Sequence, residues 1–424
     1  MAALRRGDGS GKCCRSFRCG HRSARGPRPG QSRKGACAVN KRINLIAAAF
    51  ALTALSYGLA RFAYGLLLPQ IREDLSLSPS TAGWIGSGAF AAYCLGIVLA
   101  FMAGPRLGER IVACLAGLLA TCGMALVTIA TSGGLLGLAM ALAGLSTGLT
   151  SPPLAAAVAR RFDAPMRSRA NGAINSGTAA GIILSGAAVL AIDGAWRELY
   201  MLFMVAGAAV TVWLWFAMPG RDPLFQPPPP VLPALQRPGV PGLCLSAALM
   251  GAASTTIWTF GADIMRDSLH APDSRIALAW IVLGAAGLAG AGTGVLTDRF
   301  GIKTVHRLAL FMMGTALVIL LAATFLPLLI FGVMALFGAG YILSSGAFLL
   351  WGIDLFPGRA DIGLGLPFLM IAGGQTLGAT LFGLLSEWSG YPVSFLCFAS
   401  LLAGAGFWSP NGPDPQKPAE GFSA

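Results

Sequence analysis

Long stretches without charged side chains constrain this chain more than any other feature. Residues 111–159 and 308–353 contain no Asp, Glu, Lys or Arg, and shorter charge-free stretches recur along most of the sequence. A helix needs roughly 20 apolar residues to cross the hydrocarbon core of a bilayer. The chain is 55% hydrophobic and only 11% charged, which lies outside the composition of soluble globular domains. The sequence therefore predicts an all-α membrane protein.

The two longest charge-free stretches are each long enough for two helices. One contains the turn sequence at residues 131–134, and the other is interrupted near Thr324 and Pro327. Counting each as a pair gives twelve transmembrane helices in all. We expect them at residues 43–69, 82–103, 111–131, 134–158, 169–192, 196–218, 241–263, 276–296, 305–326, 328–353, 361–386 and 391–408.

An internal repeat divides the twelve helices into two groups of six. At an offset of 193 residues, Arg106 matches Arg299 and Gly108 matches Gly301. Between the groups lies a proline-rich segment that cannot form a helix and would act as a stiff spacer. The predicted organisation is a basic, disordered tail (1–42), a first bundle (43–218), a cytoplasmic linker (219–241), a second bundle (242–408) and a cytoplasmic tail (409–424).

The net charge of +13 is concentrated in the N-terminal tail. Residues 1–42 hold 12 Lys and Arg and one acid, Asp8, so the rest of the chain is nearly balanced and no nucleic-acid partner is expected. Three explanations remain open: an anchor for anionic lipid, a targeting sequence, or a translation start placed upstream of a natural start near Val39. The tail cysteines lack the paired spacing of a zinc site, so neither a metal nor a cofactor is expected.

Loop charges predict the orientation in the membrane. With both termini in the cytoplasm, fifteen Lys and Arg between Lys41 and Lys417 fall on the inner side. Only four fall on the outer side, namely Arg72, Arg197, Arg266 and Arg275. Such an excess follows the positive-inside rule and supports an even number of helices.

One loop carries a recognisable motif. It reads Gly294-Val-Leu-Thr-Asp298-Arg299-Phe-Gly301-Ile-Lys303. Gly294 would allow close helix contact, Asp298 could pair with a cation or a helix end, and the two basic residues would hold the cytoplasmic face. The pattern resembles the loop signature of the major facilitator superfamily (MFS) of secondary transporters.

The first half carries a degraded copy of this loop. It retains Arg106, Gly108 and Arg110, but Pro105 stands where the acid would be. The resemblance covers about residues 41–410 and implies the MFS fold of two pseudo-symmetric six-helix bundles, with both loops acting in gating. The chain is also similar to the bacterial YbfB/YjiJ-like permeases, which implies a multi-pass protein of the bacterial inner (plasma) membrane.

Arg61 stands out because it is a cation well inside a predicted span. Thr53, Tyr57 and Tyr64 lie at i−8, i−4 and i+3, on one face of an α-helix. A guanidinium between two phenols suits a carboxylate or a phosphate. Arg61 precedes Pro69 by eight residues, which resembles the helix-one arginine pattern of organophosphate:phosphate antiporters. The repeat-related position is Ser254, however, which favours a monoanion. Alternatively, Arg61 snorkels outward or pairs with an outer acid.

Four further residues complete the expected substrate-binding set. They are polar or amphipathic and lie on helices that line the cavity in the resembled superfamily: Asn175, Trp258, Tyr341 and Gln375. The same residue types also serve for ordinary hydrogen bonds between helices, so each has a purely structural alternative.

These features together predict a permease rather than an enzyme. We expect a monomer that moves a small organic anion or monocarboxylate by alternating access, with proton coupling left open. The alternative is a drug or metabolite efflux antiporter of the same superfamily, although no acid lies mid-membrane to bind a cation. A membrane sensor or an enzyme is a remote alternative, because no catalytic constellation or phosphate-binding loop is present.

Overall fold

The computed structural model describes residues 29–192, 195–220, 236–323, 326–356 and 360–410. The chain divides into two compact units, residues 1–42 and 43–424. The first unit is described only as a helical stretch from Pro29, whereas we expected disorder throughout the tail. Helix propagation explains the difference, since each residue added to an existing helix gains a hydrogen bond at little cost. Everything below concerns residues 43–424.

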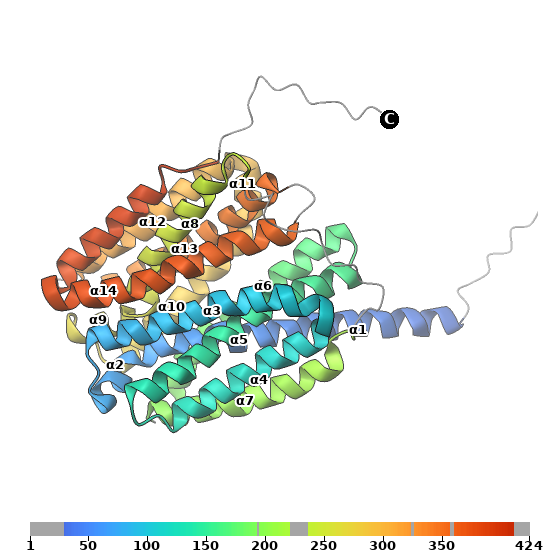
Figure 1. Ribbon diagram of the computed structural model, residues 1–424, viewed down its shortest axis with the longest axis horizontal. Helices are drawn as coiled ribbons and strands as arrows, with labels where there is room; N and C mark the ends of the chain where they lie inside the picture. Colours follow the sequence, from blue (N-terminus) through green and yellow to red (C-terminus); the bar gives the residue numbers. More distant parts are fainter. Residues whose placement is uncertain (1–28, 193–194, 221–235, 324–325, 357–359, 411–424) are drawn as a thin grey trace, which may run out of the picture. The chain divides into compact units, whose positions relative to one another are not determined.

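The described part of the chain is helical and contains no strand. In the first half the elements are α1 (Pro29–Thr53), the π-helix η1 (Ala54–Phe62), α2 (Ala63–Leu75), α3 (Pro79–Leu107), α4 (Glu109–Thr128), α5 (Gly133–Arg161), α6 (Ala164–Ala191) and α7 (Trp196–Ala217). In the second half they are α8 (Val240–Trp258), α9 (Gly261–Asp267), α10 (Asp273–Gly287), the 3₁₀-helix η3 (Leu288–Gly292), α11 (Thr293–Phe300), α12 (Ile302–Ala322), α13 (Leu329–Leu355) and α14 (Ala360–Ala405). Figure 1 shows their arrangement.

Ten helices in the described ranges are long and apolar enough to cross a membrane. The two missing from the expected twelve have local explanations. Gly390 has φ 75° inside α14, so this element is two helices joined at a kink. The expected span 276–296 is broken into α10, η3 and α11, each below spanning length. Counting these segments as spans restores the twelve helices of the prediction.

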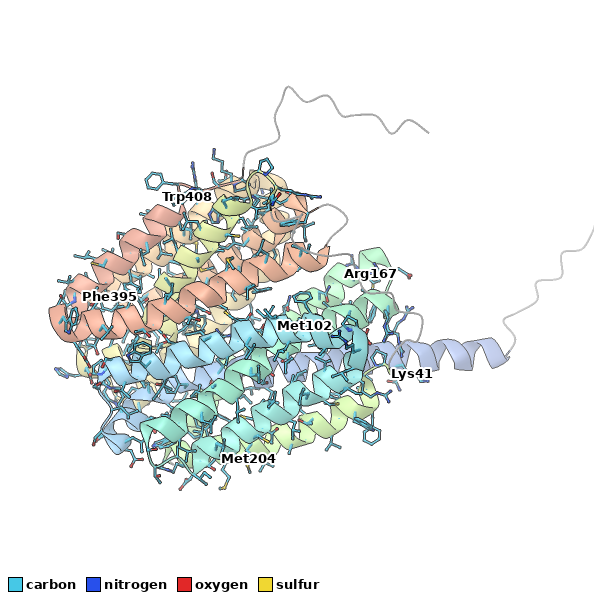
Figure 2. All side chains as sticks on the ribbon, viewed as in Figure 1. Lys41, Met102, Arg167, Met204, Phe395 and Trp408 are labelled. Carbon is cyan, nitrogen blue, oxygen red and sulfur yellow. The ribbon has the colours of Figure 1, made fainter. Side chains whose placement is uncertain are left out.

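Side chains on the outside of the helices are strongly apolar. Phe216, Phe311 and Phe407 are between 71% and 80% exposed, and Trp408, which follows the end of α14, is also exposed (Figure 2). Large exposed aromatic side chains of this number would be costly in water but suit a lipid surrounding. The fold is thus an all-α membrane protein.

Two glycines show that the sequence repeat is also a structural repeat. Gly108 has φ 81° and ψ 161°, and its counterpart Gly301 has φ 79° and ψ 150°. Each ends one helix and begins the next, in a conformation that a residue with a Cβ rarely adopts. The proline-rich linker lies mostly outside the described residues, as does the C-terminal tail after residue 410.

The most extensive contacts between the halves run along two helix pairs. Helix α3 packs against α14, and α6 packs against α10. At the α3–α14 contact, the Ser87 hydroxyl lies 2.6 Å from the Thr380 hydroxyl, and Gly83 lies against the carbonyl of Ala379. These contacts place the residues of η1, α8, α13 and α14 around one central region.

Candidate functional site

Arg61 lies in the π-helix η1, in the middle of the first span. All nine residues of η1 are buried, and the Arg61 side chain is only 5% exposed. A π-helix is rare and is frequently found at functional sites. Burial excludes the alternative in which the guanidinium snorkels to the membrane surface.

Aromatic rings surround the Arg61 guanidinium on several sides. Its Cζ lies 4.8 Å from the ring centroid of Phe62, 4.6 Å from Phe90 and 4.5 Å from Tyr93. The Tyr57 ring is more distant, at 6.0 Å. Ring faces attract a cation and hold it without neutralising its charge.

Gln375 of α14 makes the direct hydrogen bond to Arg61 across the two halves. The Nη2 of Arg61 donates to its Oε1 at 3.0 Å. The Gln375 amide nitrogen in turn donates to the Ser254 hydroxyl at 3.1 Å and to the Tyr341 hydroxyl at 3.4 Å. Ser254 is the repeat counterpart of Arg61, so the two equivalent positions meet through one glutamine.

The Arg61 charge has no acidic partner in the described parts of the chain. The ion pairs found there involve other cations, and the Nε of Arg61 is buried without a hydrogen-bond acceptor. The indole nitrogen of Trp258 is likewise buried and unpartnered. Because a buried charge is costly unless it is paired, the site has the chemistry to accept an anion.

Trp258 and Tyr341 lie beside the guanidinium cage. The Trp258 ring stacks on Phe62 with centroids 4.2 Å apart and lies 5.1 Å from the Tyr341 ring. A cavity of about 10 Å³ adjoins Trp258. That volume is enough for one water at most, so the site is closed in this conformation.

The structure brings together five of the eight predicted substrate-binding residues, namely Arg61, Tyr57, Trp258, Tyr341 and Gln375. No contact with Arg61 is described for the other three. Thr53 bonds to the carbonyl of Ala49 on its own helix, the Tyr64 hydroxyl donates to the carbonyl of Ala82, and Asn175 is exposed on α6.

Residues that the sequence did not single out as binding residues complete the cluster. Phe62, Phe90, Tyr93 and Ser254 are described above, and the Ser151 hydroxyl lies 2.9 Å from the Tyr57 hydroxyl. Their only signal in the sequence is that they are aromatic or small polar residues inside apolar spans. Ordinary core residues of membrane helices share that signal.

The intact loop motif is open in this conformation. Gly294, expected at a close helix contact, has no atom within 4 Å of where a Cβ would stand. Asp298, Arg299 and Lys303 are exposed, and no ion pair of Asp298 is found among the residues described. The expectation of close contact at Gly294 is therefore wrong for this conformation.

The degraded loop of the first half forms an ion pair in this conformation. Glu109 pairs with Arg160 of α5 at 2.5 Å, so an acid four residues after Pro105 supplies the missing carboxylate. Arg110 donates to the carbonyl of Met218 at 2.9 Å, whereas Arg106 donates to the carbonyl of Met102 on its own helix. The ionic contact on this side is thus in the first half.

We expect Glu109→Gln to lower the free energy of unfolding by about 1–3 kcal/mol, because it leaves a half-buried arginine partner with a weaker acceptor. The measurement is the thermal unfolding of purified protein in detergent. Asp298→Asn is the matched control and should change stability by less than about 0.5 kcal/mol, since Asp298 is exposed. Equal losses in both variants would contradict the assignment.

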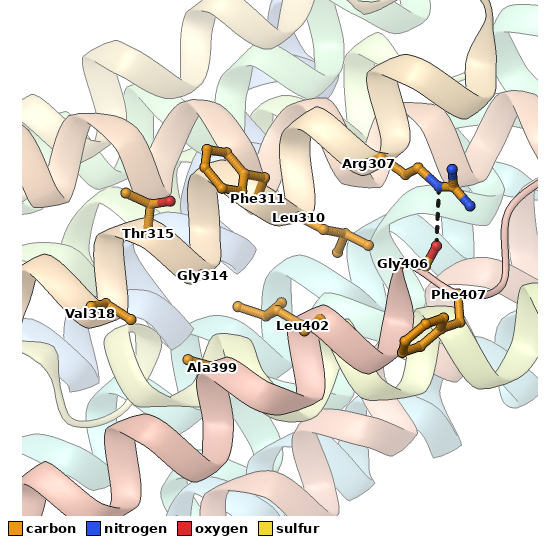
Figure 3. A pocket seen from close by; sticks show the side chains of 11 residues that line it. Arg307, Leu310, Phe311, Gly314, Thr315, Val318, Ala399, Leu402, Gly406 and Phe407 are labelled. Carbon is orange, nitrogen blue, oxygen red and sulfur yellow. Dashed lines mark hydrogen bonds between the residues drawn. The ribbon is translucent and has the colours of Figure 1, made fainter.

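A larger groove lies away from this site. It has a volume of about 560 Å³ between α12 and the end of α14, and Figure 3 shows Phe311, Leu402 and Phe407 along it. Its one charged residue, Arg307, donates from Nε to the carbonyl of Gly406 at 3.2 Å. The groove includes none of the predicted site residues, and its exposed apolar lining suits lipid.

Comparison of the sequence with known proteins gives one family and several relatives. The profile of the Major Facilitator Superfamily matches residues 50–366. A Pseudomonas aeruginosa protein named "Transcription regulatory protein OpdE" is 27% identical, over 80% of this chain and 87% of its own. Human "Monocarboxylate transporter 11" is 26% identical, over 85% of this chain and 80% of its own.

Comparison with solved structures gives the same fold. The crystal structure of the nucleoside transporter NupG (D323A mutant) superposes with a TM-score of 0.72. The match covers 86% of this chain and 98% of the other, at 14% sequence identity.

Proposed function

Since this chain belongs to the major facilitator superfamily, and is therefore a multi-pass membrane transporter and not an enzyme, we propose that its cargo is an organic monoanion, a monocarboxylate. Transport would proceed by alternating access, with the two halves rocking about the Arg61 site. We also propose that it lies in the bacterial inner membrane, as its similarity to bacterial permeases implies. The loop charges support cytoplasmic termini.

The observation that carries the proposal is the uncompensated charge of Arg61. Its guanidinium is buried between the two halves, and among the described residues it bonds only to the neutral amide of Gln375. Evolution tolerates such a charge inside a membrane chiefly where it acts on a substrate or an ion. A carboxylate would supply the missing counterion, through the fork geometry that arginine offers.

A single arginine favours one negative charge over two. The equivalent position in the second half is Ser254, and it reaches the cluster only through Gln375. The name of the human relative, a monocarboxylate transporter, supports the same substrate class. A substrate of that size needs more room than the cavity beside Trp258, so the halves must separate before it enters.

We expect monocarboxylates to stabilise the purified protein and cationic drugs to leave it unchanged. A ligand at 100 times its Kd adds about 2.7 kcal/mol to the free energy of unfolding. The measurement is a thermal-shift screen with lactate, benzoate, amino acids and cationic dyes. Stabilisation by cations alone would overturn the proposal and favour the drug-efflux alternative.

A regulatory role is the second candidate, favoured by the name of the Pseudomonas relative. In that case the chain would report on a bound solute rather than move it. Transport assays in proteoliposomes separate the two: a sensor binds its ligand without accumulating it inside the vesicle, whereas a transporter exchanges labelled for unlabelled solute.

A further inference from the structure

The stacked rings of Phe62 and Trp258 join the two halves beside Arg61. Phe62 is the last residue of η1 in the first half, and Trp258 is the last residue of α8 in the second. Their centroids lie 4.2 Å apart at an interplanar angle of 26°, and each side chain is only 3% exposed. Two rings stacked across the halves must separate when the halves move apart at this level of the bundle.

Both rings stand where a spanning helix is interrupted. The first span changes from π-helix to α-helix directly after Phe62, and α8 ends at Trp258 before α9 begins at Gly261. The backbones meet closely at this break, since the carbonyl of Trp258 leaves no room for a Cβ at Gly65 of α2. Interrupted helices typically form the substrate sites of secondary transporters. The stack therefore lies where contact with the cargo is expected.

The surroundings of Trp258 suit a flat, apolar group. The rings of Tyr341, Phe337 and Trp280 meet it edge-on, with centroids 5.1 to 6.2 Å away. The small cavity beside it is lined otherwise by glycine, alanine, leucine and isoleucine residues of α6, α10 and α13. Phe62 covers one face of the indole. That face loses its partner when the halves part, and an apolar ring face without a partner favours another ring.

This face of Trp258 lies within reach of an anion held at Arg61. The Phe62 centroid is 4.8 Å from the guanidinium Cζ and 4.2 Å from the Trp258 centroid, so a single ring separates the cation from the indole. A carboxylate in the arginine fork would have its carbon about 4 Å from Cζ, and a ring joined to it would be centred about 7 Å away. Rings interact at centroid separations of about 4.5–7 Å. A ring attached directly to the carboxylate can therefore reach Trp258.

We propose that the cargo is an aromatic monocarboxylate, and that its ring replaces Phe62 against Trp258 while its carboxylate binds Arg61. The inference rests on the proposed function and deepens it, because it names the class of acid and the residue that selects it. In the closed protein the Phe62 ring occupies the place of the cargo's ring. Gln375 connects the two ends of this site, since it accepts from Arg61 and donates to the hydroxyl of Tyr341.

Benzoate and cyclohexanecarboxylate form a matched pair of ligands for this proposal. Each carries one carboxylate on a six-membered carbon ring, and both are ionised at pH 7, but only benzoate has a flat aromatic face. A stacked aromatic pair is favoured beyond its buried area by a factor of about 2 to 10 in affinity. The unmutated protein should therefore bind benzoate more tightly than cyclohexanecarboxylate by about that factor.

The test measures both affinities by calorimetry in the unmutated protein and in variants of Trp258. Trp258→Leu should abolish the preference, because benzoate loses its stacking partner whereas cyclohexanecarboxylate keeps an apolar contact. Trp258→Phe retains a ring and should keep most of the preference. Trp388→Leu is the matched control, since it makes the same change at a side chain of α14 that is 81% exposed, and both affinities should remain unchanged.

The outcomes separate this inference from the proposed function. Equal affinities for the two acids in the unmutated protein would overturn the inference alone, because the carboxylate would still bind. A preference that survives in Trp258→Leu would also overturn it, as would a loss of both affinities by the same factor, which indicates a structural role. If no monocarboxylate binds at all, the proposed function fails and this inference fails with it.

Fluorine magnetic resonance provides a second measurement should Trp258→Leu fail to fold. The protein is labelled with 5-fluorotryptophan, and the Trp258 signal is identified by its absence from Trp258→Phe. We expect benzoate to move this signal further than cyclohexanecarboxylate does, because the ring current of a stacked ring acts on neighbouring nuclei. A Trp258 signal that responds equally to both acids, or to neither, would contradict the proposal.

Discussion

Substitution of Arg61 by glutamine is expected to weaken monocarboxylate binding by about 10- to 100-fold. The change replaces charge-assisted hydrogen bonds, worth about 1.5–3 kcal/mol, with neutral ones. Gln375 cannot compensate, because it is uncharged and its amide nitrogen already donates to Ser254. The measurement is a titration of benzoate or lactate by thermal shift or calorimetry, alongside labelled-anion exchange in proteoliposomes.

The same variant separates a substrate role from a structural one by the sign of its stability change. If Arg61 serves an anion, the empty protein bears an uncompensated buried charge, and Arg61→Gln should leave stability unchanged or raise it. If Arg61 serves folding, the variant should be destabilised. Unchanged anion binding by a well-folded Arg61→Gln protein would contradict the assignment of Arg61 to the substrate site.

Two comparison variants refine the result. Arg61→Lys keeps the charge but loses the planar fork, so its binding should fall between the parent and the glutamine variant. Arg169→Gln makes the same chemical change at an exposed position of α6 and should bind as the parent does. A loss equal to that of Arg61→Gln in the Arg169 variant would point to a general effect of net charge.

The fold could be predicted from the sequence because charge-free stretches directly indicate membrane helices. The predicted segments correspond closely to α3, α4, α5 and α12, for example. The break at Gly390 was predicted as well, since the expected spans end at 386 and begin again at 391. The change to 3₁₀ geometry in η3 was not predicted, because isolated glycines are common throughout these spans.

The site could be predicted only in part, because its central residue is charged whereas the residues around it are not. Arg61 was visible as a cation inside a span, whereas Phe90 and Tyr93 resemble any buried aromatic residues. The π-helix also has no evident sequence signal. It widens the turn and shifts the phase of later residues, which is why Tyr64, at i+3, turns to the carbonyl of Ala82 rather than to Arg61.

Charge pairing explains the remaining difference between sequence and structure. A motif search finds an acid only at its expected position, so Pro105 made the first loop look incomplete. The pair of Glu109 with Arg160 depends on where α5 ends relative to α4, which the spacing of one loop does not show. The ion pair of Arg72 with Asp263 was missed for the same reason, since these residues are 191 positions apart in the chain.

Two adjacent glycines on α14 are expected to differ strongly in how the protein tolerates an added methyl group. A Cβ at Gly374 would stand 1.9 Å from the carbonyl oxygen of Ala248 on α8, whereas a Cβ at Gly373 would meet no atom within 4 Å. Gly374→Ala must therefore push α14 away from α8, with an expected loss of about 1–3 kcal/mol. Gly373→Ala should be neutral or stabilising by up to about 1 kcal/mol, because alanine favours the helix.

The consequence for function follows from the neighbouring residue. Gln375 comes directly after Gly374, and it links Arg61 to Ser254 of α8. A displaced α14 lengthens these hydrogen bonds, so Gly374→Ala should lose anion affinity as well as thermal stability, while Gly373→Ala keeps both. Thermal unfolding and benzoate titration of the two variants test this together. Equal stability and affinity in the two variants would mean that α8 and α14 do not pack as closely as described. The hydrogen bonds through Gln375 that link Arg61 to Ser254 would then be contradicted as well.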